Sequence, residues 1–577
     1  MTVAGRKVFL VTFAWMDLYH ISPQRATLWE KHKARLEEAK EAWHRRTYWY
    51  AYPEDVKAYS EEEASRGEAE FKAQLNRPFD RLLQKGRRWV VSDEISPYTR
   101  EPLGISYPQS DVGEWIGAAQ EALSIWRWVP WSERLGLLME SIERFSRKFF
   151  EVGHATLHTT GQAWMMAFQA SGPHAADRAV EALAVAYEEL SHIPPHVRWE
   201  REMGRAKAVV EKYFIPQPEG ISLHIGVSTF PVWNVLPGLY ASLAVGSPVI
   251  VKPHPRAIYP IAIVVAVLQE IFQEYGLPVS IVQLAVDTLE KPVTRSLAEH
   301  PLIRIIDYTG GTEFGQYLEA LPNKVTFLEK AGVNCVLLES VDDIESVAKN
   351  LAFSASLYSG QMCTAPQNVY IPRSGVRTPQ GVLSYEEVAQ ALQKAIEELA
   401  SHPKAAPAIL GALQNDGVAE RVHRLSTFVQ VRRAATVYAH PQFAQARTLT
   451  PIVAEVQTAY EHVTREEHFG PRLLLIPVES AHVALEILYQ IARERGMLSC
   501  AVYTTDAGFK ESAARLLVEA AVPLSFNFRG QVFINQSVAF SDFHGTGGNP
   551  ASNASFTDSS FIAKRFHWIG VRDCLAG

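Results

Sequence analysis

Cysteine is scarce in this chain. Four cysteines occur among 577 residues, and no two of them have the CxxC spacing that redox and metal-binding motifs use. A disulfide framework is therefore not expected, no metal site is predicted, and the low cysteine content is typical of a reducing compartment such as the cytoplasm. The four positions are Cys335, Cys363, Cys500 and Cys574.

An excess of positive charge is also missing. Lys and Arg together number 56, whereas Asp and Glu number 63, which gives a net charge of -7. Nucleic acid is therefore not expected as a partner, because proteins that bind it gather cationic side chains against phosphate.

Long apolar runs are absent too. The longest internal run, around residues 261–268, is far shorter than the roughly 20 residues that span a bilayer, so no membrane segment is predicted. The apolar run at 8–16 resembles a signal peptide faintly, but Asp17 and His20 follow it without a small-residue cleavage site. We expect a buried N-terminal element there instead.

The chain is long enough for several domains. Hydrophobic residues make up 47% and charged residues 21%, which is the balance of a folded enzyme. Residues 25–44 and 61–72 are rich in helix formers and charge, and they indicate a helical N-terminal extension. The predicted divisions are this extension at 1–112, an α/β domain at 113–333, a second α/β domain at 334–526 and a C-terminal segment at 527–577.

Short β-rich runs alternate with helix-length segments beyond residue 215, after a stretch from 113 that we expect to be mostly helical. Such alternation predicts parallel sheets with crossover helices, and hence the α/β class. The expected strands lie at 221–227, 247–253, 279–285, 303–310, 334–340, 368–372, 471–478 and 499–504.

A short polar connection, SGQMCTAP at 359–366, places Cys363 between helix-like and strand-like segments. A nucleophilic thiolate needs partial exposure and nearby backbone N–H groups. Most single cysteines are inert, so the surrounding motifs must decide the role of this one.

Two further segments supply that context. FLEKAGVNC at 327–335 places Glu329 at the end of an apolar run, where desolvation would raise the pKa of its carboxyl group and suit it to act as a base toward water. A surface or ion-paired carboxylate is the alternative. DYTGGTEFG at 307–315 predicts a strand, a tight turn and a helix that begins near Thr312. Its N–H groups suit a pyrophosphate, although an ordinary strand-to-helix turn looks the same.

Together these segments resemble the aldehyde dehydrogenase superfamily over roughly residues 115 to 570. Five of its motifs recur in order: VIVKP, YTGGTEFG, LEKAG, GQMCTA and EEHFGP. The separation of Glu329 from Cys363 is 363 − 329 = 34 residues, which is the spacing of that family. The resemblance implies an NAD(P)-dependent enzyme that acts on a small-molecule aldehyde. It would have a Rossmann-type cofactor domain at 113–333, a catalytic domain at 334–526 and a small oligomerisation arm.

The resemblance also implies roles for single residues. Cys363 would be the nucleophile and Glu329 the base that activates water. Lys252 would contact the adenosine ribose of the cofactor. The pyrophosphate would lie beside Thr309, Gly310 and Gly311. Glu467 would hold the nicotinamide ribose, and Phe469 would lie near the nicotinamide.

One departure from the family pattern concerns the oxyanion. The family has Asn-Phe-Pro 23 residues before the lysine, whereas position 252 − 23 = 229 is a threonine in STFPVWN. A hydroxyl still donates beside the backbone N–H of Cys363, but loss of a well-placed donor costs about 2.7 to 4 kcal/mol. We keep Asn234 as a candidate substitute donor, with capping or packing in the following helix as its alternative.

A second departure concerns the choice of dinucleotide. Members of the family that prefer NAD commonly carry a glutamate three residues after the lysine, and here that position is Pro255. With His254 and Arg256 alongside Lys252, the pattern favours NADP over NAD, because a cation near the 2′-phosphate favours it.

Within the superfamily the chain resembles the phenylacetic acid degradation group called PaaN. TYWYAYPE at 47–54, STFPVWN, VKPHP and DFHGTGGNPASN at 542–553 carry this likeness. The implied substrate is the semialdehyde left after ring cleavage in phenylacetate breakdown, either free or linked to coenzyme A. Only about 40 residues follow Ile534, so the hydratase domain of related bifunctional enzymes is not expected.

Two alternatives remain open. The first is CoA-acylating oxidation, against which Glu329 argues because that route needs no base toward water. The second is a non-catalytic binding or scaffold subunit, which Thr229 favours and the intact Cys363, Glu329 and Glu467 oppose. The family usually forms homodimers or homotetramers, and aromatic residues after 530 would suit either an interface or packing within the subunit: Phe533, Phe540, Phe543, Phe561 and Phe566.

Overall fold

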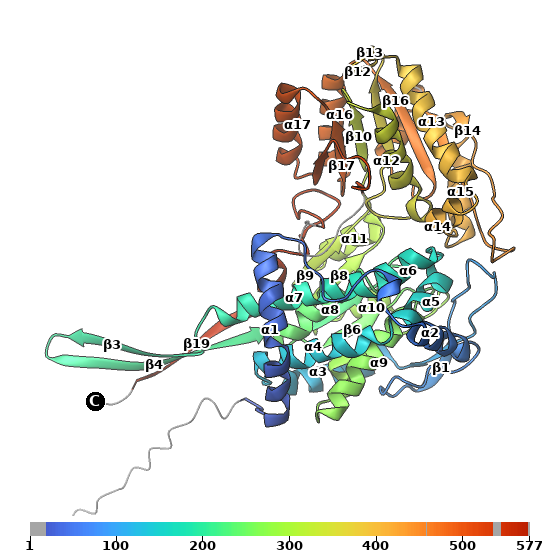
Figure 1. Ribbon diagram of the computed structural model, residues 1–577. Helices are drawn as coiled ribbons and strands as arrows, with labels where there is room; N and C mark the ends of the chain where they lie inside the picture. Colours follow the sequence, from blue (N-terminus) through green and yellow to red (C-terminus); the bar gives the residue numbers. More distant parts are fainter. Residues whose placement is uncertain (1–18, 457, 535–543, 575–577) are drawn as a thin grey trace, which may run out of the picture.

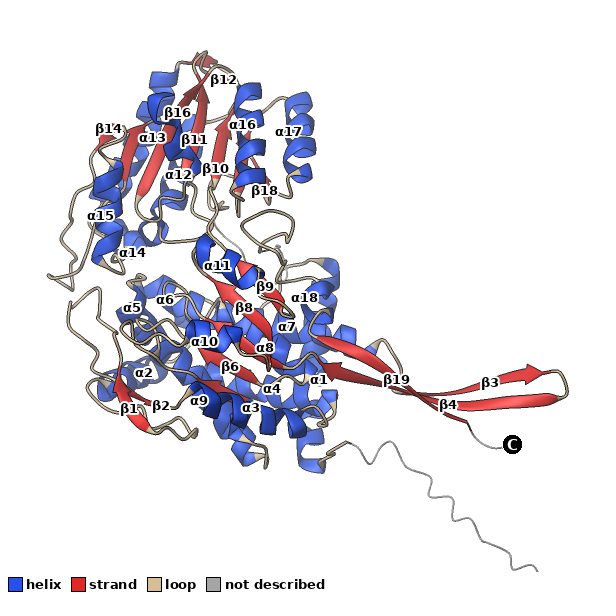
Figure 2. Ribbon diagram, turned by 180° about the vertical axis from the view of Figure 1, so that it is seen from behind, coloured by secondary structure: helices blue, strands red, loops and turns tan. Residues whose placement is uncertain are grey.

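The chain folds into two α/β bodies and a projecting arm (Figure 1). The structure is a computed structural model, and it describes residues 19–456, 458–534 and 544–574. The first body carries most of the N-terminal helices, and the second is built from residues beyond 334 (Figure 2).

The first body is organised by a five-stranded parallel sheet in the order β7-β6-β5-β8-β9. Its strands are almost fully buried, as expected for a parallel sheet covered by helices. The strands are β5 (Ile221–Ile225), β6 (Val249–Lys252), β7 (Val282–Leu284), β8 (Ile303–Thr309) and β9 (Val325–Glu329), joined through α8 (Val235–Val245), α9 (Tyr259–Glu274), α10 (Thr294–Glu299) and α11 (Thr312–Glu319).

The second body has a seven-stranded sheet in the order β14-β15-β16-β11-β10-β17-β18, parallel except for β14. Its strands are β10 (Cys335–Leu338), β11 (Asn368–Pro372), β14 (Gln430–Arg433), β15 (Ile452–Glu455), β16 (Arg472–Val478), β17 (Cys500–Tyr503) and β18 (Leu524–Phe526). The covering helices are α12 (Ile344–Ser356), α13 (Tyr385–Ser401), α14 (Ala405–Leu410), α15 (Asp416–Leu425), α16 (Ala481–Glu494) and α17 (Ala507–Glu519).

The N-terminal region packs on the first body. Buried residues of α1 (Pro23–Arg45), such as Leu36, belong to the same hydrophobic core as those of α4 (Trp131–Ser146), α7 (Pro173–Ser191) and α9. The remaining elements of this region are α2 (Glu61–Gln74), β1 (Arg88–Val91), β2 (Ser106–Gln109), α3 (Val112–Trp126), α5 (Phe149–Thr160) and α6 (Trp164–Ser171).

The arm is a three-stranded antiparallel sheet that extends away from the first body (Figure 1). A hairpin of β3 (His196–Met203) and β4 (Ala206–Pro218) pairs with β19 (Phe566–Cys574), which comes from the other end of the chain. The prediction that 113–215 is mostly helical is therefore wrong for its last part. Charged and apolar residues alternate along this hairpin, which is a strand period, and Gly204 takes a positive φ of 65° in its turn.

Most of the predicted secondary structure is confirmed. All eight predicted strands are present, as are the helices at 25–44 and 61–72, and the fold is of the α/β class. Phe561 and Phe566 pack within the subunit core, and the Phe533 ring stacks on Phe353. Phe540, Phe543 and the run at 8–16 lie outside the described residues, and the domain boundaries stay predictions. Among the described residues, no helix has the length and apolar character that a membrane span requires.

Candidate active site

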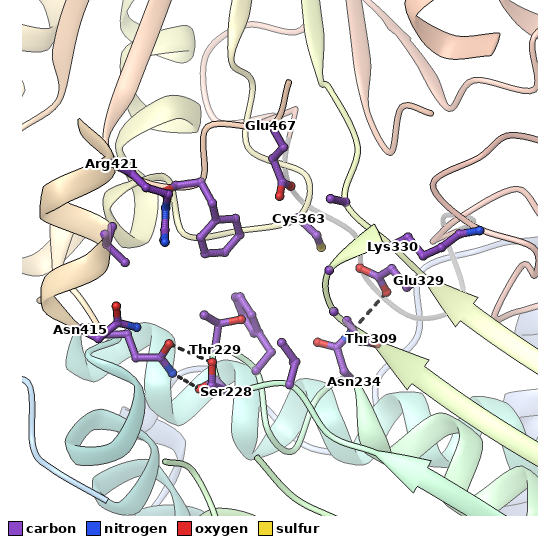
Figure 3. Close-up of a pocket in the computed structure, with 18 residues that line it drawn as sticks. Ser228, Thr229, Asn234, Thr309, Glu329, Lys330, Cys363, Asn415, Arg421 and Glu467 are labelled. Carbon is purple, nitrogen blue, oxygen red and sulfur yellow. Dashed lines mark hydrogen bonds between the residues drawn. The ribbon is translucent and has the colours of Figure 1, made fainter. Parts of the chain in front are cut away.

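A cleft of about 370 Å³ lies where the two bodies meet, at the carboxyl ends of β8 and β9 (Figure 3). Side chains from both bodies line it, and opposing domain edges are a common place for ligands. Nine of the predicted site residues line this cleft: Thr229, Asn234, Thr309, Gly310, Gly311, Glu329, Cys363, Glu467 and Phe469.

Glu329 is the last residue of β9, and the parallel register places it beside Thr309 at the end of β8. Its carboxylate is 1% exposed. The Oε2 atom accepts a hydrogen bond from Asn234 Nδ2 at 3.2 Å and lies 2.9 Å from His544 Nε2. These two partners hold the carboxyl group at the floor of the cleft.

The prediction that the pKa of Glu329 is raised is wrong. Burial does raise it, as expected from the apolar strand, but the His544 ring, the Cys363 thiol and the Arg178 guanidinium outweigh that effect and hold the pKa below its ordinary value. Glu329 is therefore an anion at neutral pH, and it can accept a proton without first losing one.

Cys363 follows η4 (Leu357–Gly360), a tight connection after α12. Its backbone is pinned because Asn334 Nδ2 donates to the carbonyl oxygen of Cys363 at 2.7 Å. Gly360 takes a positive φ of 63°, and a Cβ there would meet the Gly470 oxygen at 2.4 Å, so only glycine allows this path. The half-buried side chain points toward Glu329 (Figure 3).

The resting state of the thiol follows from its neighbours. Burial raises the pKa of Cys363 well above its ordinary value, and the carboxyl groups of Glu329 and Glu467 raise it further. The thiol is therefore protonated, and its sulfur lies within 4.8 Å of a carboxylate oxygen of Glu329.

Glu467 faces the thiol from the second body. Burial raises its pKa to about 7, against the opposing effect of Arg472. Gln367 fixes the loop that carries it, since Gln367 Nε2 donates to the Glu466 oxygen at 2.9 Å and Gln367 Oε1 accepts from His468 N at 2.8 Å.

The two candidate oxyanion donors, Thr229 and Asn234, differ in the hydrogen bonds that they form. Asn234 is the N-cap residue of α8, but its side chain does not cap the helix. Its Nδ2 instead donates to Glu329 Oε2 and, at 3.3 Å, to Thr309 Oγ1, which uses both amide hydrogens. Thr229 is 7% exposed on the cleft wall, and Gln162 Nε2 fixes it by donating to its carbonyl oxygen at 2.7 Å. The arrangement leaves Thr229 as the better candidate donor.

The turn after β8 opens toward the cleft. Gly311 is the N-cap residue of α11, which begins at Thr312 as predicted. Gly310 N donates to the carbonyl oxygen of Glu329 at 3.0 Å, so the turn and the base are fixed together. The first N–H groups of a helix attract an anion, and Gly310 and Gly311, which directly precede α11, line the cavity.

Lys252, His254 and Arg256 do not line this cleft. Lys252, at the end of β6, is 3% exposed and forms an ion pair of 2.7 Å with Asp287. Burial lowers the pKa of His254 to about 4, so its ring is neutral at physiological pH. The expectation that His254 supplies a cation for a 2′-phosphate is therefore wrong, and the cations there are Lys252 and Arg256.

Sequence reasoning missed three charged or titratable residues. His544 contacts Glu329, Arg178 influences both Glu329 and Cys363, and Arg421 lines the cleft from α15. Trp233 links two of them, since the Arg178 guanidinium lies 3.7 Å from the centre of its ring and His544 meets that ring edge-on at 4.9 Å. His544 lies within DFHGTGG, a segment quoted only for the family likeness, and nothing in the other two residues' local sequence marks them.

Three side chains of the site could also hold a metal ion. One ligand atom from each of Glu329, Cys363 and His544 lies within 4.8 Å of the others. A carboxylate, a thiolate and an imidazole are donors that zinc accepts. The predicted lack of a metal site stays a prediction.

Comparisons with a family model and with known proteins bear on this site. The model of the aldehyde dehydrogenase family matches residues 89–560. The structure of an NAD-dependent aldehyde dehydrogenase from Burkholderia multivorans is 41% identical, with a TM-score of 0.93 over 95% of this chain and 99% of that one. The benzaldehyde dehydrogenase of Pseudomonas putida is 23% identical over 82% of this chain and 93% of its own length. A Thermus 1-pyrroline-5-carboxylate dehydrogenase with bound NAD, 21% identical, shares the fold with a TM-score of 0.71 over 92% of this chain and 99% of that one.

Proposed function

The chain belongs to the aldehyde dehydrogenase family, and from this premise we propose that it oxidises an aldehyde to the carboxylic acid through a covalent adduct on Cys363. The predicted fold and enzyme class agree with the family. The observation that carries the proposal is the position of the Cys363 sulfur within 4.8 Å of the anionic Glu329 carboxylate in one cleft.

The residues of the cleft fit a nicotinamide dinucleotide. We propose that the α11 N-terminus with Thr309, Gly310 and Gly311 holds the pyrophosphate. Glu467 would accept hydrogen bonds from a ribose, and Phe469 would lie near the nicotinamide. When bound, the dinucleotide supplies the acceptor for a hydride. Lys252 would hold the adenosine ribose from the end of β6, outside the cleft around Cys363.

The first chemical step forms a carbon–sulfur bond. Glu329 takes the thiol proton, and the Cys363 thiolate attacks the aldehyde carbon to give a thiohemiacetal. The negative oxygen that develops is stabilised by the Thr229 hydroxyl and the backbone N–H of Cys363. Loss of a hydride from the former aldehyde carbon then leaves a thioester on Cys363.

The second step breaks that bond. Glu329 first passes the thiol proton to solvent and then takes a proton from a water molecule. The resulting hydroxide attacks the thioester, the carbon–sulfur bond breaks to release the acid, and Glu329 returns its proton to the leaving sulfur. The same carboxylate thus acts twice, and its lowered pKa keeps it in the anionic form that both proton transfers require.

We expect His544 to position Glu329 and to set its pKa. His544→Ala removes a partner that lowers that pKa, so the value rises and the fraction of Glu329 that is anionic falls at neutral pH. The acid limb of the kcat profile should move upward by about one pH unit. His544→Gln retains a donor and should restore part of the shift, whereas a profile that stays unchanged in His544→Ala would contradict the role.

We further propose that NADP is the preferred cofactor. No carboxylate occupies position 255, and Arg256 lies near enough to His254 for its charge to help lower that ring's pKa. We expect a higher kcat/KM for NADP than for NAD, and Arg256→Ala should lower the NADP value by about tenfold or more. Arg493→Ala, which removes an exposed arginine of α16, is the control. A strong preference for NAD would contradict the proposal.

The finer substrate proposal rests on the PaaN likeness. Three of the four segments that carry it contribute to the site: Glu54 from TYWYAYPE and Asn234 from STFPVWN line a cavity beside Cys363, and His544 from DFHGTGGNPASN contacts Glu329. We therefore propose a ring-cleavage semialdehyde of phenylacetate degradation as the substrate, either free or linked to coenzyme A. A cytoplasmic location and a homodimer or homotetramer joined through the arm complete the proposal.

The product identifies the fate of the thioester. With an aldehyde, NAD(P) and coenzyme A present together, we expect mass spectrometry to detect the free carboxylic acid, because Glu329 is an anionic base that can activate water. Formation of acyl-CoA instead would favour the CoA-acylating alternative. Dinucleotide binding without reduced nicotinamide from any aldehyde would favour a non-catalytic subunit.

A further inference from the structure

Cys363 borders a second cavity, which we call the substrate cavity. Its volume is about 310 Å³, and it shares Phe230, Asn234 and Cys363 with the cleft described above. His544 also lines it. The cleft is the proposed site of the dinucleotide. An aldehyde whose carbonyl group reaches the thiol would therefore place the rest of its chain in the substrate cavity.

Six of the thirteen residues that line the substrate cavity are apolar. Several of the lining side chains pack with Tyr358 into one hydrophobic cluster. Among the described residues, neither Lys nor Arg lines this cavity. Arg178 packs over the Trp233 ring but is only 5% exposed, so its charge is not presented to a ligand. The apolar lining residues are Met166, Ala170, Phe230, Trp233, Leu357 and Met362.

The outer end of the cavity carries a negative charge. Glu54 Oε2 lies 2.7 Å from His174 Nε2, and their side chains are 53% and 27% exposed. The hydrogen bond with His174 holds the pKa of Glu54 below its ordinary value, so the group is an anion. Asp177 lies nearby, but burial raises its pKa to about 8 and leaves it uncharged at neutral pH.

The aromatic segment at 47–54 extends this outer end. Tyr48, Trp49, Tyr50 and Tyr52 line a small adjoining pocket that shares Glu54, His174 and Trp233 with the substrate cavity. The segment is fixed, because Ala51 N donates to Asp177 Oδ1 at 2.6 Å and the Arg35 guanidinium lies 4.7 Å from the Tyr52 ring centre.

We propose that the substrate cavity selects aldehydes whose body is uncharged and apolar, and that it rejects aldehydes with a free carboxylate, so that of the two semialdehyde forms proposed above it favours the one linked to coenzyme A. The inference rests on the proposed aldehyde oxidation and deepens it. A carboxylate that enters loses water, meets neither lysine nor arginine in the wall and passes the Glu54 anion. Alkyl, aryl, ester and thioester bodies meet neither penalty, and Glu54 is the specificity-determining residue.

The test compares three aldehydes of one chain length: hexanal, methyl 6-oxohexanoate and 6-oxohexanoate. We expect kcat/KM for the methyl ester to exceed that for the free acid by about tenfold or more, mostly through KM, because desolvation of the carboxylate opposes binding. If none of the three yields reduced nicotinamide, the proposed function fails. If ester and acid react equally, the selectivity inference alone is overturned.

Two variants identify the groups responsible. Glu54→Gln removes the anion and should lower the ester-to-acid ratio at least threefold, and Gln169→Arg adds a cation to the wall and should lower it at least tenfold. Glu62→Gln makes the same charge change at an exposed site on α2 and should leave the ratio at the wild-type value. A ratio that neither Glu54→Gln nor Gln169→Arg alters would overturn the assignment.

Discussion

Cys363→Ala is expected to abolish aldehyde oxidation, with kcat falling by about 10⁴-fold or more, because no other nucleophile can carry the covalent adduct. Cys335 and Cys500 are buried in neighbouring strands, and Cys574 lies at the end of the arm. None of them faces the cleft, so none can replace the missing sulfur. The measurement is reduced-nicotinamide absorbance under saturating aldehyde.

A loss of activity has meaning only if the site survives. The Cys363 backbone is held through its carbonyl by Asn334, and alanine leaves that hydrogen bond intact. We therefore expect the variant to bind the dinucleotide with unchanged affinity in a fluorescence titration. Cys574→Ser removes an exposed thiol and should retain full activity. Turnover by Cys363→Ala at a tenth of the wild-type rate or more would contradict the mechanism.

The parts of the site that could be predicted are those carried by local sequence patterns. β8, which ends at the cleft, could be predicted because its apolar run is followed by Gly310 and Gly311. The family likeness, which includes the spacing between Glu329 and Cys363, then implied that these two residues act together. The structure places both in one cleft, with the sulfur within 4.8 Å of a carboxylate oxygen.

The parts that could not be predicted depend on contacts across long stretches of chain. His544 is 215 residues from Glu329 in sequence, yet its ring is the largest of the influences that together outweigh the effect of burial on the pKa of that carboxyl group. The resemblance implied an arm, but its strands were not located in the sequence for a related reason: β4 is completed by β19 from the other end of the chain, and helix formers in the preceding region hid the alternating pattern. Neither partner is visible in a local window.

Glu329→Gln should separate the two halves of the reaction. Glutamine keeps the size of the side chain but cannot accept a proton from water, so hydrolysis of the thioester slows by about 10²- to 10⁴-fold. Thioester formation needs the base only to take the thiol proton, which water can also accept. We expect a rapid burst of close to one reduced nicotinamide per active site, followed by slow turnover, in stopped-flow absorbance.

The accumulated acyl-enzyme provides the stronger test of that variant. Intact-protein mass spectrometry of Glu329→Gln during the slow phase should show the mass of one acyl group, and peptide mapping should place it on Cys363. Glu345→Gln alters an exposed glutamate on α12 and should show neither a burst nor an adduct. The lowered pKa of Glu329 predicts that wild-type hydrolysis persists into mildly acidic solution, because the base stays anionic there. If hydrolysis in Glu329→Gln matched the wild-type rate, water activation would have to be assigned to another group, and Glu467, whose pKa of about 7 leaves it partly anionic, would be the residue to test.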